Sequence, residues 1–287
     1  MKNKVLFHLY YIFTYGLLIA SEVVLFNFLP ISNVIVKLII CSLVGLVITY
    51  LSGLLIKNSN MFNLYFPINT SLSVSLYATT VTELNTQSYI MLAVIGCWSL
   101  RMIINYFMNH KDTKEDYRYS NLRTHKLWFL INLFFVHIIP SVIFFLVIMP
   151  TFNYLELSTL HNWNLSTFIG ICIAIFGLMY EMMADLQKYK FKKVSKNPLD
   201  VCTFGLWATS RHPNYFGEIL FWWGTFLTMT SLSNKFLVTA MGPLLLTMMI
   251  CFVSIPQVEK KQVMEKADYP DYIELVSMII PLKRNTK

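Results

Sequence analysis

Charged residues are scarce in this sequence, and their scarcity excludes an ordinary soluble domain. Asp, Glu, Lys and Arg make up 13% of the 287 residues, whereas a typical soluble domain carries roughly a quarter. Hydrophobic residues make up 56%, which is more apolar surface than a water-soluble core of this size can bury. We therefore expect much of the chain to contact lipid.

Patterns typical of metal sites and disulfide frameworks are also absent from the sequence. The five cysteines stand singly with no C-x-x-C pair, and no two of the six histidines are four residues apart. Structural zinc sites and disulfide frameworks depend on such clusters. We therefore expect no metal cofactor and no disulfide framework.

Long apolar runs predict the fold class. A run of about 20 apolar residues spans the roughly 30 Å hydrocarbon layer as a helix, which satisfies its own backbone hydrogen bonds in lipid. The sequence predicts an all-α integral membrane protein with about eight transmembrane helices. The predicted spans are Val5–Leu29, Val34–Ile56, Phe62–Val81, Ser88–Phe107, Leu127–Met149, Ser166–Leu186, Pro213–Leu232 and Phe236–Ile255.

The basic residues indicate how these helices are oriented. Cytosolic loops of membrane proteins collect Lys and Arg. With both termini in the cytosol, all of the 23 basic residues except Lys37 and Lys235 fall inside or at the inner boundary. The net charge of +8 then reflects topology and attraction to membrane lipid, so it does not argue for nucleic-acid binding.

The stretch Ser210-Arg-His-Pro-Asn-Tyr-Phe-Gly-Glu218 is the clearest candidate site. Pro213 suits the first turn of a helix, so free N–H groups and a positive dipole end are expected beside Arg211 and His212. That setting favours an anion such as a phosphate. Glu218 lies more than a turn inside the membrane, where a carboxylate calls for a partner. The alternative is that Arg211 only reaches the inner boundary and the aromatics form an interfacial belt.

A second polar cluster stands at the inner end of the sixth predicted span. Glu181 and Asp185 lie one helical turn apart, and Lys188 and Lys192 continue the same stripe. Stop-transfer charge explains the lysines but explains Glu181 poorly. An anionic nucleotide explains the mixture, since carboxylates hold ribose hydroxyls or an amide and lysines hold phosphates.

With Trp222-Trp223, the Ser210–Glu218 stretch resembles the signature of the steroid 5-alpha-reductase-like membrane proteins, in particular their bacterial-type branch. Further positions occur in the order that this branch shows, and they extend the resemblance over most of the chain from about position 100 onward. These positions are Arg101, Glu115 to Tyr119, Glu181, Asp185, Asn197-Pro198, Gly205-Leu-Trp207, Ile255-Pro256, Glu259, Tyr269, Tyr272 and Pro281.

The resemblance implies a single transmembrane domain over 1–287, with divergent helices on the substrate side (1–100) and a motif-bearing half (101–287) that encloses NADPH from the cytosol. Relatives reduce an activated carbon–carbon double bond in a lipid-like or steroid-like substrate. Taken with the basic stripe, the expected cofactor-binding residues are Glu181, Asp185, Lys188, Lys192, Arg211, His212, Asn214, Tyr215 and Glu218.

The N-terminal half departs from the branch. Where relatives carry a string resembling D-x-Y-W, this chain reads Asn63-Leu-Tyr-Phe66. In the expected reaction, hydride passes from the nicotinamide to the electron-poor carbon while a tyrosine stabilises the developing enolate. Tyr65 and Tyr77, in the polar third span, are the candidate catalytic residues.

Two alternatives remain open. Isoprenylcysteine carboxyl methyltransferases share an R-H-P-x-Y core but bind S-adenosylmethionine, and they lack the Asn-Tyr-x-Gly-Glu continuation. The basic stretch Lys188–Lys196 suits a cofactor with three phosphates better than a sulfonium cation. The other alternative is a non-catalytic lipid-binding relative, because Asn63 and Phe66 are altered. The bacterial plasma membrane is favoured over the endoplasmic reticulum.

Overall fold

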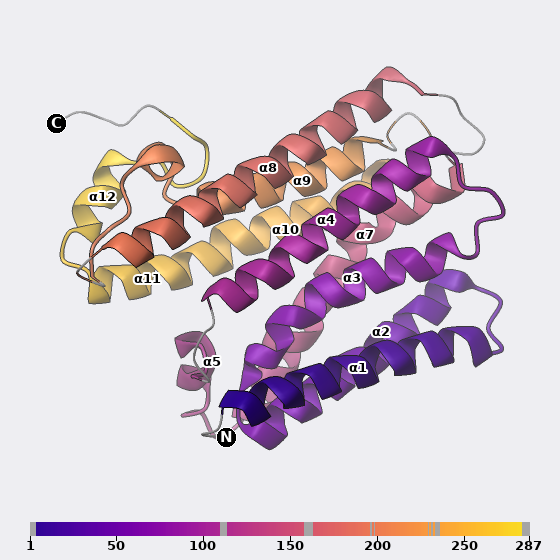
Figure 1. Ribbon diagram of the computed structural model, residues 1–287, viewed down its shortest axis with the longest axis horizontal. Coiled ribbons are helices and arrows are strands. Elements are labelled where there is room, and N and C mark those ends of the chain that lie inside the picture. Colours follow the sequence, from indigo (N-terminus) through magenta and orange to yellow (C-terminus); the bar gives the residue numbers. More distant parts are fainter. Residues whose placement is uncertain are drawn as a thin grey trace. The chain divides into compact units, whose positions relative to one another are not determined.

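The computed structural model describes residues 4–109, 114–157, 163–195, 197, 199–228, 230, 232 and 236–282. Within these residues every regular element is a helix and no strand occurs, which confirms the expected all-α class (Figure 1). The chain separates into two compact units, Met1–Asn162 and Trp163–Lys287.

The first unit consists of long helices with short helical segments between them. The long helices are α1 (Lys4–Phe28), α2 (Val34–Ile56), α3 (Phe62–Ala78), α4 (Thr86–Asn109) and α7 (Ile139–Leu157). The short segments are η1 (Ser59–Met61), α5 (Tyr117–Leu122), α6 (Trp128–Ile131) and the π-helical η2 (Asn132–Ile138). The last of these joins α6 to α7, so that one helix runs from Trp128 to Leu157.

The second unit carries the motif-bearing stretches. Its elements are α8 (Leu165–Val194), η4 (Gly205–Ala208), α9 (Pro213–Thr228), α10 (Phe236–Met249), the π-helical η5 (Ile250–Ser254), α11 (Ile255–Glu265) and α12 (Tyr269–Leu275). One helix runs from Leu237 to Glu265 through η5. Helix α9 begins at Pro213, as the sequence predicts.

Both π-helical segments end just before a proline. The segment η2 ends at Ile138, two residues before Pro140, and η5 ends at Ser254, two residues before Pro256. Proline has no N–H, and its ring clashes with the carbonyl group one turn earlier. Widening the preceding turn to the π form relieves that clash while the helix continues.

Among the described residues, six helices are long and apolar enough to cross a membrane, which indicates a multi-pass integral membrane protein. They are Lys4–Phe28, Val34–Ile56, Thr86–Asn109, Trp128–Leu157, Leu165–Val194 and Leu237–Glu265. The other two predicted spans correspond to α3 and α9, which have 17 and 16 residues. At 1.5 Å per residue these two helices measure only about 25 Å.

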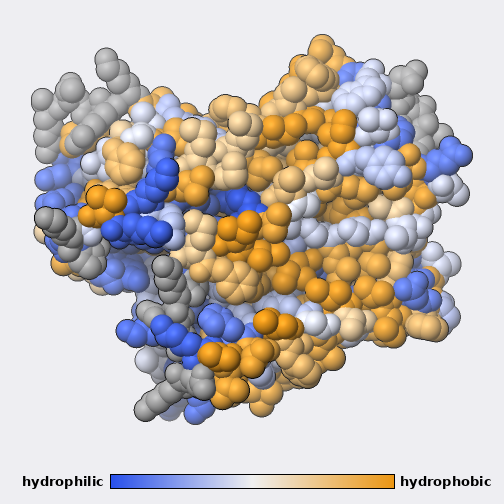
Figure 2. Space-filling model, viewed as in Figure 1, coloured by the Kyte–Doolittle hydropathy of each residue, from blue (hydrophilic) through white to orange (hydrophobic). Residues whose placement is uncertain are grey.

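Apolar side chains cover the long helices on their outer faces. Ile12 and Phe13 of α1, Leu55 of α2 and Leu237 of α10 are all strongly exposed. Figure 2 shows apolar residues over much of the visible surface, with hydrophilic residues gathered mainly around α11 and α12 of the second unit and around α5 of the first unit. A surface of this kind is stable against hydrocarbon and unstable in water.

One carboxylate lies fully buried inside the first unit. Glu22 of α1 is 0% exposed, and a Cβ on Gly45 of α2 would overlap its Oε1 atom. With its amide oriented to donate, the Asn69 nitrogen lies 3.1 and 3.2 Å from the two Glu22 carboxylate oxygens and 3.1 Å from Ser42 Oγ. This cluster joins α1, α2 and α3, because a carboxylate at such a depth needs polar partners.

In the second unit, α8 and α9 run antiparallel with their backbones in contact. A Cβ on Gly177 of α8 would lie 2.6 Å from Phe221 N and 2.7 Å from Gly217 O, and one on Gly170 would lie 2.6 Å from Thr228 N. Small residues at such spacing are how membrane helices bring their backbones together, since lipid supplies no hydrophobic drive between helices.

We expect Gly177→Ala to destabilise the protein, because the added methyl group would overlap backbone atoms of α9 and Leu220 Cβ, which cannot move without the helix. The expected cost is about 1–3 kcal/mol, seen as a lower melting temperature of the detergent-purified protein. Gly96→Ala is the matched control, since nothing lies within 4 Å of a Cβ at that helical position. Equal melting of both variants would contradict the close contact of α8 and α9.

Candidate functional site

Helix α8 carries the basic stripe beyond the membrane. Its 30 residues measure about 45 Å, while the hydrocarbon layer is roughly 30 Å thick. Asn164 caps its first turn by accepting a hydrogen bond from Thr167 N (2.9 Å). Lys192 and Lys193 occupy its last turn, where the helix dipole favours positive charge. The turns that carry Lys188 and Lys192 therefore extend past the hydrocarbon.

The segment between α8 and α9 folds back on these last turns. Leu206 N donates to Gln187 Oε1 (2.9 Å), and Trp207 Nε1 donates to Ala184 O (2.9 Å). Gly205 has a φ of +60°, and a Cβ there would lie 2.6 Å from Gln187 Oε1. Glycine is thus required at this turn, both for its backbone conformation and for the space that the glutamine occupies.

The C-terminal segment is hydrogen-bonded to the same loop. The Tyr272 hydroxyl donates to Trp207 O (2.5 Å) and to Ser210 O (3.3 Å). In return, Ser210 Oγ donates to Ile279 O (2.7 Å). These bonds hold α12 and the residues after it against the start of α9.

Arg211 stands at the centre of this junction. Its Nε donates to Glu259 Oε1 (2.7 Å), and its Nη1 donates to the carbonyl oxygens of Ile273 (2.9 Å) and Val276 (2.6 Å). His212 Nε2 lies 2.9 Å from the same Glu259 oxygen. One carboxylate on α11 therefore fixes both members of the Arg-His pair that precedes α9.

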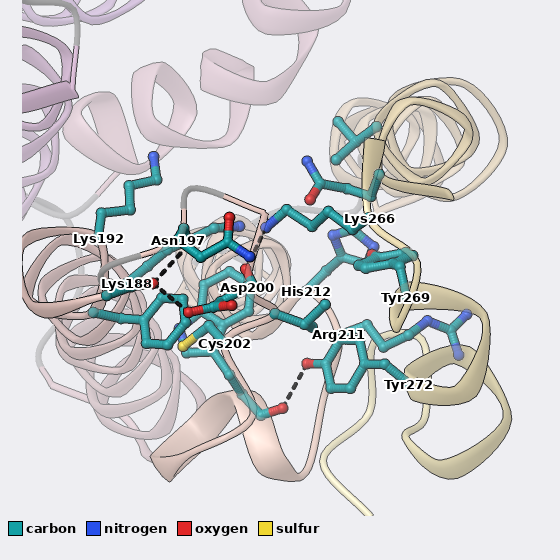
Figure 3. Close-up of a pocket in the computed structure, with 16 residues that line it drawn as sticks. Lys188, Lys192, Asn197, Asp200, Cys202, Arg211, His212, Lys266, Tyr269 and Tyr272 are labelled. Carbon is teal, nitrogen blue, oxygen red and sulfur yellow. Dashed lines mark hydrogen bonds between the residues drawn. The ribbon is translucent and has the colours of Figure 1, made fainter. Parts of the chain in front are cut away.

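A cavity of about 370 Å³ lies among these elements (Figure 3). Basic residues line it from three directions: Lys188 and Lys192 from the end of α8, Arg211 and His212 from the segment before α9, and Lys266 from the turn after α11. We call it the basic cavity. Its volume falls within the range of roughly 300–1,000 Å³ typical of small-molecule sites.

Aromatic rings form much of the remaining wall. Phe191, Trp207, Tyr269 and Tyr272 all line the basic cavity. The Lys188 ammonium lies 4.0 Å from the centroid of the Trp207 ring, a cation–π contact that orients this lysine. The site therefore combines positive charge with flat apolar surfaces on which a ring can stack.

Positive charge is crowded in the basic cavity. Burial, and after it the charge of Lys192, lowers the pKa of Lys266, whose Nζ donates to Asp200 O (2.6 Å). Burial also lowers the pKa of His212, although its hydrogen bond to Glu259 acts in the opposite direction. Like charges held this close favour an anionic ligand that neutralises them.

The structure brings Lys188, Lys192, Arg211 and His212 together at the basic cavity. The other expected cofactor residues are not among the described residues that line it. They are Glu181, Asp185, Asn214, Tyr215 and Glu218.

Several of these other residues pack around the start of α9. The Tyr215 ring stacks on the His212 ring at 5.5 Å between centroids. Glu218 accepts a hydrogen bond from Trp222 Nε1 (2.7 Å), one helical turn along α9. Glu181 is buried against Gly217, where α8 and α9 touch. Tyr215 thus supports a residue that lines the basic cavity, while Glu181 packs within the contact of α8 with α9.

The two candidate catalytic tyrosines lie in the first unit, on α3. The Tyr65 hydroxyl donates to Ser42 O (2.8 Å), and the Tyr77 hydroxyl donates to Glu156 Oε2 (3.2 Å). Both side chains are buried. They stand roughly 18 Å apart along the helix, so they cannot act on one substrate atom together.

Four residues without an expected site role lie at the basic cavity or support it: Lys266, Asp200, Glu259 and Trp207. Glu259 and Trp207 belonged to the resembling positions, so a signal for them was present. Lys266 and Asp200 sit among other charged residues, and no local pattern distinguishes them.

Known proteins are similar to this chain over parts of both of its units. A family model described as "Protein of unknown function (DUF1295)" matches residues 49–277. An uncharacterized protein of Schizosaccharomyces pombe (strain 972) is 23% identical over 217 residues, covering 64% of this chain and 63% of the yeast protein. No solved structure matches the chain. Because the family model covers both units, from within α2 to beyond α12, the chain belongs to the DUF1295 family.

Proposed function

We propose that this protein is an NADPH-dependent reductase that reduces an activated carbon–carbon double bond in a lipid-like or steroid-like substrate. The observation that carries the proposal is the basic cavity, where Lys188, Lys192 and Lys266 surround one hollow with aromatic walls. A nucleotide with several phosphates matches this combination, since lysines bind phosphates and aromatic rings stack on bases.

The donor set of the cavity fits NADPH. Lys188, Lys192 and Lys266, which all line the cavity, would hold phosphate oxygens. Trp207, with Lys188 already against its ring, offers a face for a base. When bound, NADPH supplies a hydride to the electron-poor carbon of the substrate.

In this proposal Arg211 positions the groups around the cavity and does not bind phosphate. Its guanidinium is bonded to Glu259 and to the carbonyl groups of Ile273 and Val276. These bonds hold α12 in place as a wall, and Glu259 fixes the orientation of His212. His212, stacked on Tyr215, would then accept a hydrogen bond from the cofactor at its remaining ring nitrogen.

The substrate side is assigned to the first unit. Tyr65 and Tyr77 are alternative candidates for the hydrogen-bond donor to the developing enolate, because they stand too far apart to act on one oxygen. Tyr77 has the more suitable partner, because Glu156 can exchange a proton with it, whereas Tyr65 donates to a backbone carbonyl group.

The proposal includes a topology of eight spans with both termini in the cytosol. Helices α3 and α9 would be the two short spans, near the lower end of the roughly 17–25 residues that a bilayer requires. Polar residues of α3 such as Asn69 and Ser73 would then face neighbouring helices rather than lipid. The Ser73 hydroxyl lies within hydrogen-bond distance of the Ser42 hydroxyl on α2. The bacterial plasma membrane is the proposed location.

We expect NADPH to raise the melting temperature of the detergent-purified protein and to show altered nicotinamide fluorescence on binding. Lys266→Met should weaken NADPH binding by about tenfold or more, because a charge-assisted phosphate contact is lost. Lys190→Met is the matched control, since Lys190 is exposed on α8 and does not line the basic cavity.

The same titration with NADH and S-adenosylmethionine separates the rival functions. A response to S-adenosylmethionine alone would replace the reductase proposal with methyl transfer, although a sulfonium cation gains nothing from three nearby lysines. No response to any of the three would leave a lipid-binding protein without an enzyme activity.

Arg211→Ala should destabilise the nucleotide-free protein by about 3 kcal/mol, because it leaves the Glu259 carboxylate and two carbonyl groups without their donor. Thermal unfolding without nucleotide measures the loss. Lys266→Met should melt close to wild type in the same assay, because Lys266 makes one hydrogen bond at a loop. If Arg211→Ala kept its melting temperature and lost NADPH binding alone, the arginine would be a phosphate ligand.

A further inference from the structure

A second cavity, of about 430 Å³, lies in the first unit, between α1, α3 and α4. Tyr11, Ile12 and Tyr15 line it from α1, Leu64 and Ile68 from α3, and Ile103 from α4. We call it the apolar cavity. It has no part in the nucleotide site proposed above, whose residues all belong to the second unit.

The apolar cavity opens toward hydrocarbon. Ile12 lines it and is nevertheless 70% exposed, so the hollow is open beside this residue. Two of its three walls, α1 and α4, are long enough and apolar enough to span a membrane. The apolar part of this hollow favours a hydrocarbon ligand over water.

Polar groups mark one end of the cavity. The Tyr106 hydroxyl donates to the Tyr11 hydroxyl (3.2 Å), and the two rings stack at 6.3 Å between centroids. A hydroxyl that accepts a hydrogen bond still has its own proton to donate. The Tyr15 hydroxyl, by contrast, is engaged with Met61 O. His8 lies one turn before Tyr11 and lines the same end of the cavity, toward the start of α1.

We propose that the apolar cavity is a binding site for one acyl chain with a carboxyl or ester carbonyl group at its polar end. The chain lies along Ile12, Ile68 and Ile103, and the carbonyl oxygen accepts the Tyr11 proton near His8. A few placed polar groups in an otherwise apolar hollow fix the orientation of such a ligand. The shared chemistry is that of a free fatty acid or of a phospholipid chain.

The test uses full-length protein in detergent and a palmitic acid that carries a diazirine near the end of its chain. After photolysis, we expect saturable labelling on peptides of α1, α3 or α4 that line the cavity. Ile103→Trp, which fills the cavity, should reduce the labelling by about tenfold or more. Tyr11→Phe keeps the ring and should weaken the labelling by about three- to tenfold, because one hydrogen bond to the ligand is lost.

Ile104→Trp is the matched control, because Ile104 is the exposed neighbour of Ile103 on α4 and does not line the cavity. Melting curves without lipid establish that each variant is folded. Competition by unlabelled palmitate alone identifies a fatty-acid site, and competition by phosphatidylcholine as well identifies a phospholipid chain. Labelling that spreads over all exposed helices, or that Ile103→Trp leaves unchanged, overturns the proposal.

The outcome is independent of the nucleotide site. Lys266→Met should be labelled like wild type, with or without NADPH, because its altered residue lies in the basic cavity. Failure of NADPH binding would leave the acyl-chain site intact, and failure of the labelling would leave the reductase proposal intact.

Discussion

Backbone atoms of α8 and α9 touch at Gly177 and Gly217, where a Cβ on either residue would lie within 2.7 Å of backbone atoms across the contact. Seven residues earlier on α8, Gly170 meets Gly224, seven residues later on α9. This repeat fixes the register of the two helices and so the height of Lys188 relative to Arg211. Two of the three basic walls of the basic cavity, those of α8 and of the segment before α9, thus depend on small residues inside the membrane.

A second constraint closes the cavity from the other side. Glu259 sits on a helix that continues the last candidate span, and its carboxylate binds Arg211 and His212 together. Both side chains are largely buried, so the pair persists only if each charge has its partner and the remaining donors are satisfied. The carbonyl groups of α12 satisfy them, and in doing so they bring Tyr269 and Tyr272 to the cavity wall.

The sequence predicts the positions of most helices well, because partition into lipid depends on the hydropathy of each segment by itself. The bounds Val34–Ile56 and the start of α9 at Pro213 agree with the structure, since hydropathy and proline act within a few residues. The partner of Arg211 was not predictable, because a guanidinium donates hydrogen bonds to a phosphate or to a carboxylate equally well. Lys266 meets Asp200 only through the return of the chain after α11, and no local pattern encodes that return.

The two units carry cavities of different chemistry, a basic one in the second unit and an apolar one in the first. In the second unit, lysines gather past the end of α8, where water lowers the cost of their charge, and a polyanion relieves their repulsion. In the first unit, two of the three walls of the apolar cavity are helices long enough to span a membrane, and His8 and the tyrosines of α1 provide its polar groups. Helices long enough to cross the membrane and to extend past it can therefore carry one site for a charged ligand and another for an apolar ligand.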